Sequence, residues 1–419
     1  MHTARSKILF ATLCTAFVML FIQNIAMTVM APDVMVSLRL SPDQMGVLGG
    51  AYLYAYACAQ FCSGMLAARF GPRRILSLFF VIAAAGGLLF AGTEDYGCAL
   101  AGRGMTGLGT AVVMACSVTL FSRWYPPESH ATITAWFYSI GGLGSYIGTA
   151  PFSWLNAQVG WRNAYAVVAL AALGISIAVW CVVRDWPPDG DPHYAPQSHR
   201  VMTLREIGSN LALISKNRDF WRLVAWCATM SAMFYTFAGL WGGVYLQAVY
   251  GLSHTQAGAI LSLGALGFIV GNPLLAWLCR NVFRSYRAGM AISGPLGAVA
   301  ACGLVFYTGD MSPPVLSALV LVLCLAANAP NAILFTSARI LFGGRMLGSV
   351  GGIFGFSTFL SGGFLQILTG YLLKHAETAG LTPAAAYSRA FIPLLVCCLV
   401  CSVVCFRVTE TYGKAENEI

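Results

Sequence analysis

Charged residues are scarce in this chain of 419 residues: only 9% are Asp, Glu, Lys or Arg, whereas 58% are hydrophobic. Soluble domains carry about 25% charged residues, and a water-soluble fold of this size could not hide so much apolar surface. The composition therefore excludes a soluble protein and predicts an all-α protein with many membrane-spanning helices. The net charge of +9 falls in loops beside apolar runs, where it reflects membrane topology rather than a nucleic-acid partner.

Motifs for nucleotides and metals are also missing. The chain has no G-x-x-x-x-G-K-[ST] phosphate loop and no cluster of His and Cys with metal-ligand spacing. We therefore expect no metal, no cofactor, no enzymatic activity and no ATP-driven transport by this chain. Most of its 14 cysteines fall inside apolar runs, including the pair Cys398-x-x-Cys401. That pair has redox spacing without a βαβ context, so we interpret these cysteines as packing residues.

Long apolar runs dominate what is present. A membrane-crossing helix needs about 20 mostly apolar residues, and this rule predicts twelve spans in two halves of six. The spans lie near residues 8–31, 44–68, 73–92, 97–120, 130–155, 162–184, 219–247, 255–279, 287–308, 314–341, 347–373 and 386–407. A polar segment, 185–217, divides the chain into an N-terminal half (1–184) and a C-terminal half (218–419).

The basic residues alternate between the predicted connections. The connections on one side hold most of them, whereas the other side holds only Arg39, Arg162, Lys374 and Arg389. Lys and Arg are retained in the cytoplasm during insertion. The pattern predicts an even number of spans, with both termini on the cytoplasmic side of a bacterial inner membrane.

One short connection carries the clearest motif. Residues 64–74 read G-M-L-A-A-R-F-G-P-R-R and join the second and third spans. So short a loop makes the flanking helices antiparallel neighbours, and its three arginines mark the cytoplasmic side. A second basic connection, at Arg280, Arg284 and Arg287, follows roughly 210 residues later. The two halves therefore echo each other.

The motif G-x-L-A-x-R-x-G-x-R-R resembles the loop signature of the major facilitator superfamily. That resemblance covers essentially the whole chain. It implies two six-helix halves that rock about a substrate at the midplane. It also implies gating or conformational roles for the matching residues, which are Gly64, Arg69, Gly71, Arg73 and Arg74. The family usually has an acid at the position of Ala68, where it caps or pairs at the cytoplasmic gate, so the inner lock of this chain is unassigned.

Arg103 is the one charged residue predicted to lie well inside a span. A charge at that depth costs about 2.5–3.5 kcal/mol on insertion scales, so it should face a cavity or a partner. Two interpretations stay open. Arg103 is either a structural residue that pairs with Asp33 at the end of the first span, or the anchor of an anionic substrate. The second is favoured because no carboxylate lies deep in any span, and Arg binds carboxylates and phosphates bidentately.

Other polar residues inside the spans are candidates for the substrate cavity. The first, fourth, seventh and tenth spans line the cavity in the family that the chain resembles. On that ground the predicted substrate-binding set, with Tyr56 and Gln60 in second rank, is Arg103, Gln23, Asn24, Tyr56, Gln60, Tyr235, Asn328 and Asn331. Each could instead provide hydrogen bonds between helices. Asp33 is the candidate for proton coupling, while exchange and facilitated diffusion stay open.

Three functions compete at this point. The leading hypothesis is a secondary transporter of a small organic anion, such as a carboxylate, sugar acid or phosphorylated metabolite. The alternative is a multidrug or amphipathic-compound exporter, which the many aromatic residues and methionines favour and the missing buried acid disfavours. The third is a transporter-like sensor of a metabolite, although the segment 185–217 shows no appended signalling domain. All three imply a small-molecule partner and the lipid bilayer.

Overall fold

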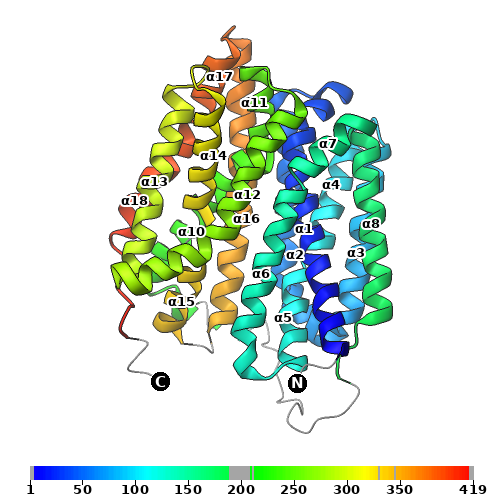
Figure 1. Cartoon of the computed structure of the whole chain (residues 1–419), viewed down its shortest axis with the longest axis vertical. Helices are drawn as coiled ribbons and strands as arrows, with labels where there is room; N and C mark the ends of the chain where they lie inside the picture. The colour runs from blue at the N-terminus through cyan, green and yellow to red at the C-terminus, as the bar shows by residue number, and fades with distance from the viewer. Residues whose placement is uncertain (1–3, 188–207, 210–211, 329–330, 344–345, 415–419) are drawn as a thin grey trace.

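The chain folds into a bundle of long helices that run in alternating directions (Figure 1). The structure, a computed structural model, describes residues 4–187, 208–209, 212–328, 331–343 and 346–414. The helices of the N-terminal half are α1 (Ala4–Ser37), α2 (Pro42–Phe70), α3 (Pro72–Gly92), α4 (Tyr96–Thr110), α5 (Val113–Trp124), α6 (His130–Ile147), α7 (Ala150–Val159) and α8 (Trp161–Val182), with a 3₁₀ turn η1 (Pro127–Ser129).

The C-terminal half repeats this arrangement. Its helices are α10 (Arg218–Thr236), α11 (Gly242–Tyr250), α12 (His254–Leu278), α13 (Tyr286–Phe306), α14 (Pro313–Asn328), α15 (Asn331–Phe342), α16 (Leu347–Thr378), α17 (Pro383–Ala390) and α18 (Ile392–Cys405), with π-helical turns η3 (Phe237–Trp241) and η4 (Cys279–Phe283). Grouped by direction, the helices form the predicted twelve spans. The pairs α4–α5, α6–α7, α10–α11, α14–α15 and α17–α18 each form one span.

Within the described residues, nine helical segments are long and apolar enough to cross a membrane unaided. The remaining spans are α2, α6–α7 and α14–α15. The break between α6 and α7 falls at Gly148 and Thr149, so neither piece alone has the length of a span. The prediction of an all-α membrane protein is therefore confirmed.

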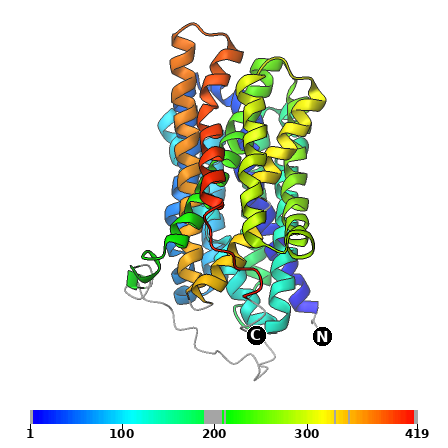
Figure 2. The same cartoon turned by 90° about the vertical axis from the view of Figure 1, so that its left-hand side faces the viewer.

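Both views place the start of α1 and the segment after α18 at the same end of the bundle, here called the terminal end (Figures 1 and 2). Helices α7, α11 and α17 lie at the opposite end, the far end. Contacts between the halves run along α2 with α16, and join α1 to η3 and α11, and α12 to α6 and α7.

One local expectation was wrong. The first span was predicted to end near residue 31, just before Pro32, but α1 continues to Ser37 with Pro32 inside it. Inside a bundle, neighbouring helices hold a helix together across the hydrogen bond that proline removes. Asp33 therefore lies on a helix face rather than in a loop.

Candidate functional site

Arg103 lies on α4 in the interior of the N-terminal half. Its side chain is 2% exposed. One terminal nitrogen, Nη1, donates to the backbone oxygen of Gln23 at 3.2 Å and to the hydroxyl of Tyr165 at 2.9 Å. The guanidinium also lies over the rings of Tyr52, at 4.9 Å from the centroid, and Phe90, at 5.8 Å. Helices α1, α2, α3 and α8 thus hold the arginine in one place.

These contacts leave a defined part of the guanidinium free. Arginine has five N–H donors, and the hydrogen bonds of Arg103 in the described part of the chain all come from Nη1. Nε is buried without a partner. Nε and Nη2 together form the side-on fork that binds a carboxylate or phosphate through two parallel hydrogen bonds.

Asp33 does not neutralise this charge. Its carboxylate faces the C-terminal half instead, where His254 Nε2 lies 3.4 Å from Oδ1. Asn156 Nδ2 donates to the other oxygen at 2.7 Å. No ion pair within the described ranges includes Arg103. The expected pairing of Asp33 with Arg103 is therefore wrong, and the groups that hold Arg103 are instead Gln23 and Tyr165.

An aromatic row extends from Arg103 across the boundary between the halves. Tyr52 and Tyr56 follow each other on α2, with ring centroids 6.1 Å apart. Tyr56 packs at 4.1 Å on Phe359 of α16, and Phe359 lies 5.1 Å from Tyr235 of α10. The structure thus brings two predicted site residues, Tyr56 and Tyr235, against the same ring. Phe359 was missed because a single phenylalanine in an apolar run gives no signal.

Amide oxygens without partners accompany this row. Gln23 on α1, 1% exposed, has its Oε1 buried and unpaired, and the same holds for Oε1 of Gln60 on α2. Gln366 on α16 donates from Nε2 to the backbone oxygen of Tyr235 at 2.8 Å, and its own Oε1 is unpaired. Buried polar groups normally have partners, so these oxygens are candidates to accept hydrogen bonds from substrate hydroxyls or water.

The remaining predicted substrate residues divide into two groups. Asn24 is buried on α1 beside Gln23. The side chains of Asn328, the last residue of α14, and Asn331, the first of α15, lie outside the described residues. Two surface pockets of the described structure do not include Arg103: one is lined by α13 and Phe406, the other by α3, Glu94 and α8.

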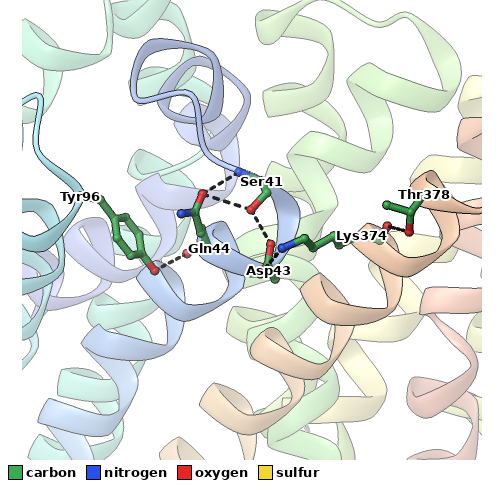
Figure 3. A network of polar contacts seen from close by, with 6 residues as sticks. All are labelled: Ser41, Asp43, Gln44, Tyr96, Lys374 and Thr378. Carbon is green, nitrogen blue, oxygen red and sulfur yellow. Dashed lines mark hydrogen bonds and ion pairs between the residues drawn. The ribbon is translucent and has the colours of Figure 1, made fainter.

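The far end is closed by polar contacts between the halves. Lys374 Nζ on α16 donates to Asp43 Oδ2 on α2 at 2.8 Å (Figure 3). Ser41 donates to the same carboxylate, and its backbone nitrogen donates to Gln44 Oε1 at 3.0 Å, which caps the start of α2. Tyr96 donates to the Gln44 backbone oxygen at 3.1 Å. This network ties α16 to the first turn of α2.

A second lock lies beside it, on other helices. It contains the Asp33–His254 pair, and the hydroxyl of Ser153 on α7 donates to the His254 backbone oxygen. The pairing of Asp33 with His254 and of Asp43 with Lys374 was missed by the sequence analysis. The sequence carried one signal for these pairs: charged residues are few near the far end, so each of them is expected to have a partner.

The predicted gating residues lie at the terminal end, around the α2–α3 turn. Gly71 has φ +88°, which favours glycine, and Arg73 donates its backbone N–H to Asp185 Oδ1 at 2.8 Å. The Arg73 Nε donates to the Trp180 backbone oxygen at 2.9 Å. Asp185, which the sequence analysis missed, directly follows the N-terminal half and caps α3 of that half.

The other predicted gating residues have few contacts. Arg69 and Arg74 are exposed, and Arg69 lies over the Phe70 ring at 5.4 Å from the centroid. Gly64 has open space on its Cβ side.

Comparison with known proteins gives the family. The model of the Major Facilitator Superfamily matches residues 12–366. The probable sulfoacetate transporter SauU of Cupriavidus necator is 23% identical over 377 residues, which cover 86% of each chain. The hexuronate transporter of Escherichia coli K12 is 23% identical over 385 residues, covering 86% of this chain and 85% of that one.

The fold agrees with solved structures. A bacterial homologue of the human lysosomal transporter Spinster, solved in an inward-facing and occupied conformation, superposes with a TM-score of 0.76 at 15% identity and covers 97% of both chains. This chain is therefore not an enzyme but a membrane transporter that belongs to the major facilitator superfamily.

Proposed function

We propose that this transporter moves a small organic anion by alternating access, with Arg103 as the anchor of the anionic group. The observation that carries the proposal is a buried arginine that forms no ion pair among the described residues and whose Nε is unpaired. A buried cation without a counter-ion is costly, and a substrate carboxylate, sulfonate or phosphate would supply the missing charge. The sulfoacetate and hexuronate transporters named above carry anions by name, which supports the same class.

The rest of the substrate is assigned to the neighbouring polar groups. The unpaired oxygens of Gln23, Gln60 and Gln366 would accept hydrogen bonds from hydroxyl groups, and the Tyr56–Phe359–Tyr235 row would pack against the carbon skeleton. Asn24, Asn328 and Asn331 remain candidates for the same cavity. A site of this kind suits a polyhydroxy acid better than a lipophilic cation, because a cation would meet the positive charge of Arg103.

The gates and the orientation are part of this proposal. Both termini would face the cytoplasm of a bacterial inner membrane, so that the far end opens outside. Gly64, Arg69, Gly71, Arg73 and Arg74 would act in the gate at the terminal end. Asp33 would be the coupling residue, because protonation of its carboxylate would weaken the lock with His254 and Asn156.

Thermal stabilisation of the purified protein tests the anchor directly. The panel contains sugar acids, sulfonates, sugar phosphates, neutral sugars, amino acids and lipophilic cations. We expect an anion to stabilise the wild type, Arg103→Ala to lose that shift, and Arg103→Lys to recover only part of it, because lysine keeps the charge without the fork. Arg39→Ala is the matched control, since it removes an exposed charge at the far end.

Counterflow in proteoliposomes then separates transport from binding alone. Radiolabelled anion should accumulate against unlabelled anion in the wild type and in Arg39→Ala, and not in Arg103→Ala. Stabilisation by lipophilic cations that Arg103→Ala leaves unchanged would favour the exporter and defeat the anion proposal. Binding without counterflow would favour the sensor.

A further inference from the structure

An open groove of the C-terminal half lies apart from Arg103 and the aromatic row. It has a volume of about 460 Å³ and is lined by apolar side chains, namely Ala288, Ala291, Ile292, Pro295, Leu296 and Val299 of α13 together with Phe406. The α13 residues include pairs three apart, such as Ala288 and Ala291, and pairs four apart, such as Ala288 and Ile292, so they form a single face of the helix. Ile292, Val299 and Phe406 are exposed, at 41%, 70% and 64%. This α13 groove therefore opens on the outer surface of the bundle.

The length and position of the α13 groove match one leaflet of a bilayer. From Ala288 to Val299 the helix rises about 17 Å, and half of a hydrocarbon core is about 15 Å thick. The groove begins next to the start of α13, at the terminal end, and extends toward the middle of the membrane. An acyl chain of the leaflet at the terminal end could therefore lie along its whole length.

Arginines surround the entrance of the groove. Arg287 precedes the first lining residue, Ala288, and Arg407 follows the last, Phe406. Arg280 and Arg284 lie in and just after η4, the turn before α13. All four side chains are exposed, and no ion pair within the described ranges uses them. The entrance therefore has a strong positive charge.

The acidic residues described near the entrance of the groove, Glu410 and Asp219, already bind other groups. Glu410 accepts from Ser285 and from the backbone N–H groups of Tyr286, at 3.0 Å, and Tyr412, at 2.9 Å. Burial alone would raise its pKa, but these hydrogen bonds outweigh that effect and lower it, so the carboxylate stays ionised. Asp219 pairs with Arg222 and accepts from Thr409. Because Glu410 occupies the N–H groups that begin α13, only the arginine side chains are left for an anion.

We propose that the α13 groove binds an anionic phospholipid of the leaflet at the terminal end, with its acyl chain along α13 and its phosphate on Arg287 and Arg407. An apolar hollow in a bilayer gains nothing from the hydrophobic effect by binding another helix, because lipid tails are equally apolar. The selective part of the site is thus its charge, and arginine binds phosphate bidentately. This site is separate from Arg103 and does not depend on the transported substrate.

Native mass spectrometry of the delipidated protein tests this proposal. The protein is incubated with phosphatidylglycerol and phosphatidylcholine of identical acyl chains at equal concentration. We expect preferential retention of phosphatidylglycerol, and an Arg287→Gln/Arg407→Gln variant should bind it about thirtyfold more weakly, at about fivefold for each arginine near the surface. The matched control is Arg5→Gln/Arg184→Gln, which removes two exposed charges from the other half and should stay within about twofold of the wild type.

Two further measurements make the result decisive. Ile292→Trp should fill the groove and weaken the lipid while the melting temperature stays near that of the wild type, which would show that the variant is folded. Equal retention of the two lipids, or equal losses in both double variants, would overturn the proposal. Complete competition by inorganic phosphate would assign the arginines to a free anion. A dimer that Ile292→Trp dissociates would assign the groove to a second copy of the chain.

Discussion

The two ends of the molecule use their charged residues in different ways. At the far end, Asp43 with Lys374 and Asp33 with His254 each join one half to the other. Among the described residues of the terminal end, the charged contacts do not join the halves: Arg73 pairs with Asp185, next to the end of α8, and Asp219 pairs with Arg222. The far end is therefore locked across the boundary along which the halves would have to separate, whereas the terminal end is stabilised within each half.

The difference between the two ends should affect the equilibrium between the states that are closed and open at the far end. Contacts between the halves exist only while that end is closed, so they stabilise one state of the cycle. Contacts within a half persist in every state and do not bias the equilibrium. Ala68 agrees with this difference between the ends, because this chain has an alanine at the terminal end where the family usually has an acid. The far-end locks should thus favour the conformation that is closed at that end.

Among the tests of this difference between the ends, the largest effect is expected from steric exclusion rather than from charge. Gly243 of α11 packs directly on the backbone of Thr28 in α1, so a Cβ at this position would collide with the Thr28 carbonyl oxygen. Overpacking costs about 1–3 kcal/mol, and here it acts only where the far end is closed. We expect Gly243→Ala to reduce counterflow by about tenfold or more.

A glycine of the terminal end provides the control. Gly352 on α16 has open space on its Cβ side, so Gly352→Ala should transport like the wild type. Equal losses in both variants would show that glycine flexibility, not the close approach of α1 and α11, is what transport requires.

The second effect concerns Asp33. In Asp33→Asn the contact of the carboxylate with His254 is changed and the hydrogen bond from Asn156 is weakened, at a cost of about 1–2 kcal/mol to the closed far end. We expect the far end to open more often, by about tenfold, and proton-driven uptake to fall while counterflow persists. The measurement compares both transport modes in the same proteoliposomes. If both modes fall together, Asp33 is a gate residue without a role in coupling.

How much of the fold and of the site could be predicted depends on whether the sequence signal lies within one helix or involves residues far apart in the chain. The spans were predicted well because the hydropathy of one contiguous stretch identifies a membrane helix. The buried Arg103 was identified because it is a lone charge in an apolar run. The scarcity of charges near the far end indicated that Asp33 has a partner, but the partner's identity could not be predicted, because His254 comes from the other half and nothing local links them. The course of α1 past Pro32 depended on neighbouring helices in the same way. The unpaired oxygens of Gln23, Gln60 and Gln366 also required the packed structure.

The third prediction concerns a substitution that adds an acid at the terminal end. Ala68→Asp restores an acid beside Arg69 at the end of α2, and we expect it to favour closure of the terminal end. A Gly64→Cys reporter, placed where the structure has open space, should then react more slowly with a hydrophilic maleimide, by about two- to fivefold for a shift of about 0.5–1 kcal/mol. Exposed native cysteines such as Cys58 and Cys62 are first replaced by serine. An unchanged rate would indicate that another residue supplies the inner lock.

The smallest effect belongs to the most visible contact, the Asp43–Lys374 ion pair. Both side chains are partly open to solvent, at 30% and 47% exposure, and exposed ion pairs contribute about 0.2–1 kcal/mol. A double-mutant cycle with Asp43→Asn and Lys374→Met should therefore give a coupling of about 0.5 kcal/mol in the equilibrium between far-end-closed and far-end-open states, and this coupling should decrease in high salt. Distances between spin labels on α2 and α16 would report the populations. A coupling above about 2 kcal/mol would mean that the Asp43–Lys374 pair, rather than the buried packing around Gly243, is the main contact that stabilises the closed far end.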